Sequence, residues 1–174
     1  MRSSFISDTD FSVVLRLLTH ENALCCLVAL ETGLRISDVL AIRTKQIKQK
    51  SFTVREQKTG KCKRIKLDNE LRQQLVMISG SVYVFQHRTD PTRHRTRQAV
   101  YLDLKRAAKA LRLSVNLTPH STRKNYAVGL YGRYGDLKVV QTALNHSHLE
   151  DTLLYCLSDV LQSSERLPKR RIHK

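Results

Sequence analysis

The segment from about Glu21 to Glu31 constrains the fold more than any other, because a helix over these residues would be apolar on most of its faces. Such a helix is stable where other elements cover it, so we expect it at the centre of the domain. Thr32-Gly33 follows, and glycine is the usual residue just past a helix C-terminus. The rest of the chain must therefore build layers around residues 21–31.

Helical periodicity and capping residues predict the surrounding elements. Residues 52–56 and 62–67 alternate as two strands, with 58–61 as the turn between them. Helices are expected from a cap at Asp10, over Ser37–Ile42, after a cap at Asp68, over Thr96–Leu111, from Pro119 to a break at Gly135, over Asp136–Leu144 and after the segment 146–155; Val82–Phe85 is expected as a short strand. The predicted fold is mainly α with a small β-hairpin or short antiparallel sheet, a mixed α+β class.

One domain is expected over all 174 residues, with a core over about 8–165 and a basic tail over 166–174. Few residues precede the first predicted helix, so we expect no separate N-terminal domain in this chain. It carries 31 Lys and Arg against 15 Asp and Glu, a net charge of +16. This excess favours a polyanionic partner, although it does not separate DNA from RNA or anionic lipid, and a merely basic soluble domain remains an alternative. The cations expected to contact DNA are Lys61, Arg93, Arg95, Arg97 and Lys124.

The cysteines and the hydropathy pattern indicate an intracellular protein without a metal. The cysteines stand at 25, 26, 62 and 156, and their spacing matches no recognised zinc site. We expect reduced, structural thiols and no cofactor. Apolar runs fall short of the ~18 residues of a membrane span, and the first residues do not form a signal peptide. The expected location is cytoplasmic and nucleoid-associated, away from membranes.

Three short segments carry side chains suited to phosphate chemistry. They contain Arg35, the pair His120 and Arg123, and the pair His146 and Tyr155. Guanidinium groups present a bidentate fork to anionic oxygens, imidazoles move protons near neutral pH, and a phenol can attack phosphorus. Taken singly, these residues have plainer interpretations as surface ion pairs, solvated helix faces or a half-buried tyrosine. Together they indicate transfer of a DNA strand.

These segments resemble the tyrosine recombinases, or phage-type integrases. Thr32-Gly-Leu-Arg-Ile-Ser-Asp-Val-Leu is similar to the first arginine motif of that family, and Pro119-His-Ser-Thr-Arg to its His-x-x-Arg box. Leu144-Asn-His-Ser, with Tyr155 nine residues after His146, is similar to its third box; Asn145 replaces a glycine there. Gln57-Lys-Thr-Gly-Lys resembles the lysine turn of the family. The resemblance covers about residues 8–165 and implies the fold of a tyrosine recombinase catalytic domain.

The resemblance also implies roles for individual residues. Tyr155 is the nucleophile that forms a 3′-phosphotyrosine, and Lys58 is the general acid that protonates the leaving 5′-oxygen. Lys61, Lys63, Arg64 and Lys66 surround Lys58, so its assignment competes with theirs. The two arginines hold the phosphate, His120 accepts the phenolic proton, and His146, with His148 as a rival, donates to the phosphate. Asp38 orients the side chain of Arg35 or His120 without contacting the phosphate itself.

The implied activity is site-specific recombination of double-stranded DNA, independent of metal and ATP. Integration, excision and inversion are equally compatible with the motifs. The implied assembly is a homotetramer on paired sites, with accessory DNA-bending proteins as further partners. Two alternatives remain open: a type IB topoisomerase-like enzyme that acts as a monomer, and a non-catalytic DNA-binding regulator derived from the family.

Overall fold

A computed structural model describes residues 4–146 of the chain. The chain divides into two compact units, Met1–Tyr126 and Ala127–Lys174, and the boundary falls inside one long helix. The first unit holds α1 (Asp8–Leu17), α2 (His20–Thr32), α3 (Ile36–Leu40), α4 (Thr44–Ile47), β1 (Phe52–Arg55), β2 (Cys62–Ile65), α5 (Asn69–Ile78), α6 (Arg97–Ala110) and the first half of α7 (Pro119–Tyr134). The second unit holds the rest of α7 and α8 (Leu137–Ala143).

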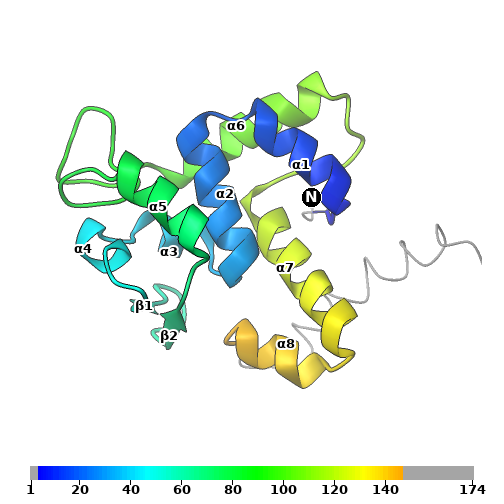
Figure 1. Cartoon of the computed structure of the whole chain (residues 1–174). Coiled ribbons are helices and arrows are strands. Elements are labelled where there is room, and N and C mark those ends of the chain that lie inside the picture. The colour runs from blue at the N-terminus through cyan, green and yellow to red at the C-terminus, as the bar shows by residue number, and fades with distance from the viewer. Residues whose placement is uncertain (1–3, 147–174) are drawn as a thin grey trace, which may run out of the picture. The chain divides into compact units, whose positions relative to one another are not determined.

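The helix α2 is central to the first unit, as its apolar composition predicts. Leu24, Cys25, Val28 and Ala29 are fully or almost fully buried, and α1, α3, α5 and α6 all pack against this helix (Figure 1). The core extends through these helices to the buried face of the hairpin and to Leu117. The fold class is mainly helical with one two-stranded antiparallel sheet, which confirms the predicted α+β class.

The end of α2 requires a glycine for two reasons. Gly33 caps the helix in the left-handed region, with φ of 68°, which side chains with a Cβ disfavour. A Cβ on Gly33 would also lie 2.4 Å from the ring of Tyr126 on α7. The chain can therefore turn sharply after α2 and pass close under α7, which places Arg35 two residues beyond the turn.

The β-hairpin forms over the residues whose alternation predicts it. β1 and β2 are antiparallel, with Phe52 opposite Ile65 and Arg55 opposite Cys62. Phe52, Val54 and Ile65 face the core, and the alternate side chains of β1 are exposed. The hairpin presents its turn, residues 56–61, at the edge of the unit.

Two predictions about local structure were wrong. The cap of α1 is Ser7 rather than Asp10, because the Ser7 side chain accepts a hydrogen bond from the Asp10 N–H. Val82–Phe85 forms no strand: Tyr83 makes an isolated bridge with Arg43. The opposing segment turns into α4 at Thr44, so it offers no further backbone to pair with.

Several boundaries agree with the sequence. Asp68, Thr96 and Asp136 cap the helices that follow them, each through its side chain, and Gly135 follows α7 with φ of 65°. Asn145 adopts φ of 54°, so the residue in place of the family's glycine does take the left-handed conformation that asparagine tolerates. The short helix α4 was not predicted, since four residues carry little periodicity.

Asp103 of α6 holds the start of α2 against α6 through hydrogen bonds. Its Oδ2 accepts hydrogen bonds from the Thr19 N–H at 2.8 Å and from the Asn22 amide at 2.8 Å. Its Oδ1 accepts from the Arg106 Nε at 3.0 Å, and Arg106 also donates to the Leu17 carbonyl. Thr19, the N-cap residue of α2, makes no capping bond of its own, so α6 supplies the acceptor that the helix start lacks.

Replacement of Asp103 by Ala should therefore lower the free energy of unfolding by about 2–3 kcal/mol, because the buried Asn22 amide and the partly buried Thr19 N–H lose their acceptor. Urea unfolding of the two proteins, followed by circular dichroism, measures the difference. Glu70→Ala, at an exposed position of α5, is the matched control and should change stability by about 0.5 kcal/mol or less. Equal effects of the two substitutions would show that Asp103 does not hold α2 in place.

Candidate active site

One open pocket of the first unit, about 220 Å³ in volume, collects four of the six residues predicted to be catalytic. Arg35 comes from the start of α3, Lys58 from the hairpin turn, and His120 and Arg123 from the first turns of α7. The complete lining is Arg35, Ile36, Ser37, Lys58, Arg97, Pro119, His120 and Arg123. His146 belongs to the second unit, and Tyr155 lies outside the described residues.

Arg35 is the N-cap residue of α3, with extended backbone at φ of −69° and ψ of 145°. Its side chain is 14% exposed, and its Nη1 donates to Oε2 of Glu56, whose side chain is 1% exposed. The motif comparison gave Glu56 no role. Alternation along β1 could have found it, because Phe52, Val54 and Glu56 all fall on the inward phase.

The lysine turn is fastened to α3 through Asp38. Oδ1 of Asp38 accepts from the Gln57 N–H at 2.9 Å, so the hydrogen bond of this carboxylate goes to the turn rather than to Arg35 or His120. Burial raises the pKa of Asp38, and the charge of Glu56 adds to that rise, while the Gln57 N–H and the two arginines oppose it. Lys58 follows Gln57 directly and is exposed.

Two cations bind the last carbonyl groups of α2. Arg123 donates from Nη1 to the Gly33 carbonyl, and Lys63 of β2 donates from Nζ to the Thr32 carbonyl at 2.5 Å. The Lys63 ammonium also lies 5.3 Å from the ring centroid of Tyr126, within cation–π range. The sequence motifs identify Lys63 only as a neighbour of Lys58, because its position at the helix end depends on a contact between residues far apart in sequence.

Burial and neighbouring positive charge lower the pKa values of two basic side chains in this region. Burial, with the charge of Arg123, lowers the pKa of Lys63 to about 8, against a smaller opposing effect of Glu56. Partial burial lowers the pKa of His120, and the charges of Arg97, Arg123, Arg35 and Lys58 lower it further. A neutral imidazole at pH 7 can accept a proton, which is the role predicted for His120.

The residues predicted to contact DNA fall into different environments. Lys61, Arg93 and Arg97 are exposed, and Arg97 also lines the pocket. Arg95 is half-buried. Lys124 is 8% exposed, and its contact with DNA stays a prediction.

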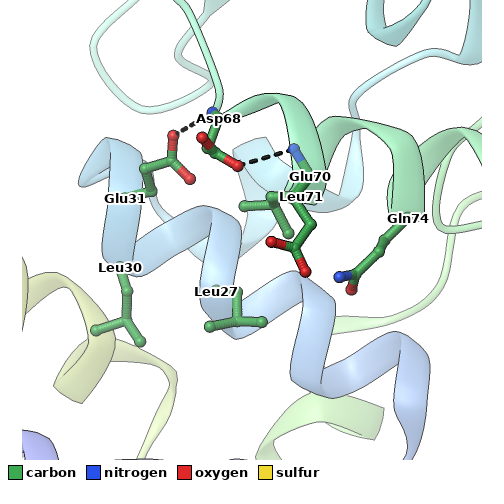
Figure 2. Close-up of a pocket in the computed structure, with 7 residues that line it drawn as sticks. All are labelled: Leu27, Leu30, Glu31, Asp68, Glu70, Leu71 and Gln74. Carbon is green, nitrogen blue, oxygen red and sulfur yellow. Dashed lines mark hydrogen bonds between the residues drawn. The ribbon is translucent and has the colours of Figure 1, made fainter.

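A second pocket, about 390 Å³ in volume, lies between α2 and α5. Figure 2 shows its leucine side chains, Leu27, Leu30 and Leu71, beside the carboxylates of three acidic residues. Glu31 accepts from the Asp68 N–H, and Asp68 accepts from the Glu70 N–H (Figure 2). Carboxylates repel phosphate, so this pocket does not suit a nucleic-acid backbone.

Residues 4–146 contain no group of three or more His, Cys, Asp or Glu side chains arranged to hold a metal ion. Cys25, Cys26 and Cys62 are free thiols. Burial raises the pKa of Cys26 to about 12, and the charge of Asp103 adds to the rise, which makes this thiol a weak nucleophile. In the same part of the chain, every helix is too short or too polar to cross a bilayer.

Comparisons with known proteins agree on one family. The phage integrase family matches residues 10–160. Tyrosine recombinase XerC from Mesorhizobium japonicum is 29% identical over 147 residues, which cover 79% of this chain and 47% of that protein. The chain therefore spans about half the length of such relatives.

Solved structures share the fold. The catalytic domain of bacteriophage HP1 integrase superposes with a TM-score of 0.64 at 16% identity, covering 99% of this chain and all of that one. The XerH site-specific recombinase bound to a palindromic difH substrate gives a TM-score of 0.69 at 19% identity, covering 94% of this chain and 52% of that one.

The lowered pKa of Lys63 predicts how stability changes with pH. Between pH 8 and 10.5 the unfolded chain holds a proton on Lys63 that the folded chain has lost, so rising pH favours folding through this group. Lys63→Met removes the titration and keeps most of the stem. Over pH 7.5–9.5, the free energy of unfolding of the natural chain should rise relative to that of the variant. A difference that does not vary with pH would show that Lys63 is not desolvated.

Proposed function

The chain belongs to the phage integrase family, and on this premise we propose that it is the catalytic domain of a site-specific recombinase, which cleaves and rejoins DNA strands through a 3′-phosphotyrosine. The observation that carries the proposal is the convergence of Arg35, Lys58, His120 and Arg123 on one pocket from three separate segments. This set can bind an anion, accept a proton and donate a proton within one site.

Arg35 and Arg123 are the proposed phosphate ligands. Both line the pocket, and their other contacts, to Glu56 and to the Gly33 carbonyl, hold the guanidinium groups in fixed orientations. Donors oriented before the reaction stabilise the charge that develops on the non-bridging oxygens without reorganising during the step. In this mechanism the arginines perform the charge stabilisation, and neither metal nor ATP is required.

Proton transfer completes the proposed mechanism. The lowered pKa of His120 keeps its imidazole neutral, so it can accept the phenolic proton as Tyr155 attacks phosphorus. Lys58 projects from the exposed turn and donates a proton to the departing 5′-oxygen, while His146 donates a hydrogen bond to the phosphate. The phosphotyrosine keeps the bond energy, and a 5′-hydroxyl from another strand can then attack it and reseal the DNA.

The proposed partner is double-stranded DNA. The net charge of +16 and the exposed cations Lys61, Arg93 and Arg97 favour the phosphate backbone, and XerH is bound to its difH substrate in the similar structure. We further propose a homotetramer on paired sites, assisted by DNA-bending proteins. A topoisomerase-like enzyme would instead act as a monomer, so the number of chains bound per DNA separates the two proposals.

The covalent step is tested with a nicked suicide duplex. Its sequence is one that the natural chain binds in a selection from a randomised library of duplexes. The natural chain should form an adduct that survives denaturing electrophoresis, and Tyr155→Phe should abolish it while leaving DNA binding nearly unchanged, because only the hydroxyl is lost. Tyr134→Phe is the matched control, since Tyr134 is 58% exposed. Full adduct yield from Tyr155→Phe would show that another residue is the nucleophile. No adduct from the natural chain would favour the non-catalytic regulator.

A substrate with a 5′-bridging phosphorothioate tests Lys58. Sulfur leaves without protonation, so Lys58→Ala should slow cleavage of the ordinary duplex by about 10²-fold or more yet cleave the sulfur substrate at nearly the natural rate. Lys50→Ala, at an exposed position just before β1, should leave both rates close to natural. Equal defects of Lys58→Ala on the two substrates would make Lys58 a phosphate contact instead of the acid.

A further inference from the structure

Glu56 is the buried charged residue at the pocket for which neither the sequence motifs nor the proposed mechanism gives a function. Its side chain is 1% exposed. Oε2 accepts from the Arg35 guanidinium and also from the Thr59 hydroxyl at 3.1 Å. One carboxylate oxygen therefore joins the first arginine of the pocket to the residue next to Lys58.

The backbone of Glu56 also closes the turn that carries Lys58. The Glu56 N–H donates to the Lys61 carbonyl at 2.9 Å, and the Glu56 carbonyl accepts from the Gly60 N–H at 2.8 Å. Gly60 has φ of 67°, which a turn this tight requires and glycine permits. Lys58 thus sits at the exposed tip of a loop whose base is fastened by Glu56.

A buried carboxylate at this point has opposing effects on the reaction. It balances part of the positive charge of Arg35, so it competes with phosphate for that guanidinium and weakens ground-state binding. It also fixes the direction of the guanidinium, and small errors in position slow a reaction strongly. Its effects on affinity and on rate should therefore have opposite signs.

We propose that Glu56 is a positioning residue, which orients the Arg35 guanidinium and the Lys58 turn toward the same phosphate through one carboxylate oxygen. The inference rests on the proposed function, because it assigns a common target to Arg35 and Lys58. Glu56 acts through Arg35 and Thr59, and its carboxylate does not contact the DNA.

Glu56→Gln keeps the shape of the side chain and removes its charge. In the full chain, single-turnover cleavage of the nicked duplex should slow about tenfold or more. Affinity for an intact duplex, measured in a Tyr155→Phe background, should rise about two- to threefold as a competing charge is removed. Glu70→Gln removes one negative charge from the pocket of Figure 2 instead, and it should leave the cleavage rate unchanged. A loss of both rate and affinity in Glu56→Gln would indicate damage to the fold and overturn the proposal.

Thr59→Val separates the two arms of the network, because it removes the hydroxyl that donates to Glu56 and accepts from the Lys61 N–H within the turn, and it leaves the bond between Arg35 and Glu56 in place. Cleavage of the ordinary duplex should slow about threefold or more, with recovery on the 5′-bridging phosphorothioate, since that substrate does not need Lys58. Thr53→Val, at an exposed position of the same hairpin, is the matched control and should cleave both substrates normally. A Thr59→Val defect that persists on the sulfur substrate would contradict the link to Lys58.

Binding alone distinguishes failure of this inference from failure of the proposed function. If the natural chain forms no adduct, the proposed function fails, and a double-mutant cycle for intact-duplex affinity still tests Glu56. The increase in affinity from Glu56→Gln should disappear in an Arg35→Ala background, because the two side chains act as one unit. An equal increase in both backgrounds, or none in either, would overturn the role of Glu56.

Discussion

Two cations from distant parts of the chain bind the last carbonyl groups of α2, and the layout of the pocket depends on this interaction. The final turn of α2 contains no basic residue, yet a helix C-terminus carries negative partial charge and carbonyls without intrahelical partners. Lys63 and Arg123 supply the missing donors from β2 and α7. The same bonds hold the hairpin and the start of α7 against the turn at Gly33, where Arg35 emerges.

Bringing several cations together costs electrostatic free energy, and this cost favours the binding of an anion in the pocket. Burial, and to a smaller extent repulsion from neighbouring cations, lowers the pKa values of Lys63 and His120, and Glu56 offsets part of the positive charge. A phosphate entering the pocket would relieve the remaining repulsion. Strained electrostatics of this kind are typical of functional sites, where stability is exchanged for groups already oriented toward a ligand.

Local sequence signals predicted most elements and four residues of the pocket, and they were wrong where a partner segment decides the structure. Gly33, Asp68 and Asn145 behave as their conformational preferences require. Val82–Phe85 has strand-forming residues but meets only the bridge beside Arg43. Composition likewise counts Lys124 as a cation without showing that its side chain is buried.

The sequence by itself determined the family, the order of the elements and the residues with the chemistry for phosphate transfer, because motifs, capping residues and periodicity are local. Only the tertiary structure decided which charged groups meet. It paired Arg35 with Glu56, directed Asp38 to the lysine turn, and placed Lys63 at the end of α2. These pairings join residues 19 to 31 positions apart, and a Coulomb or hydrogen-bond energy depends on distance in space rather than along the chain.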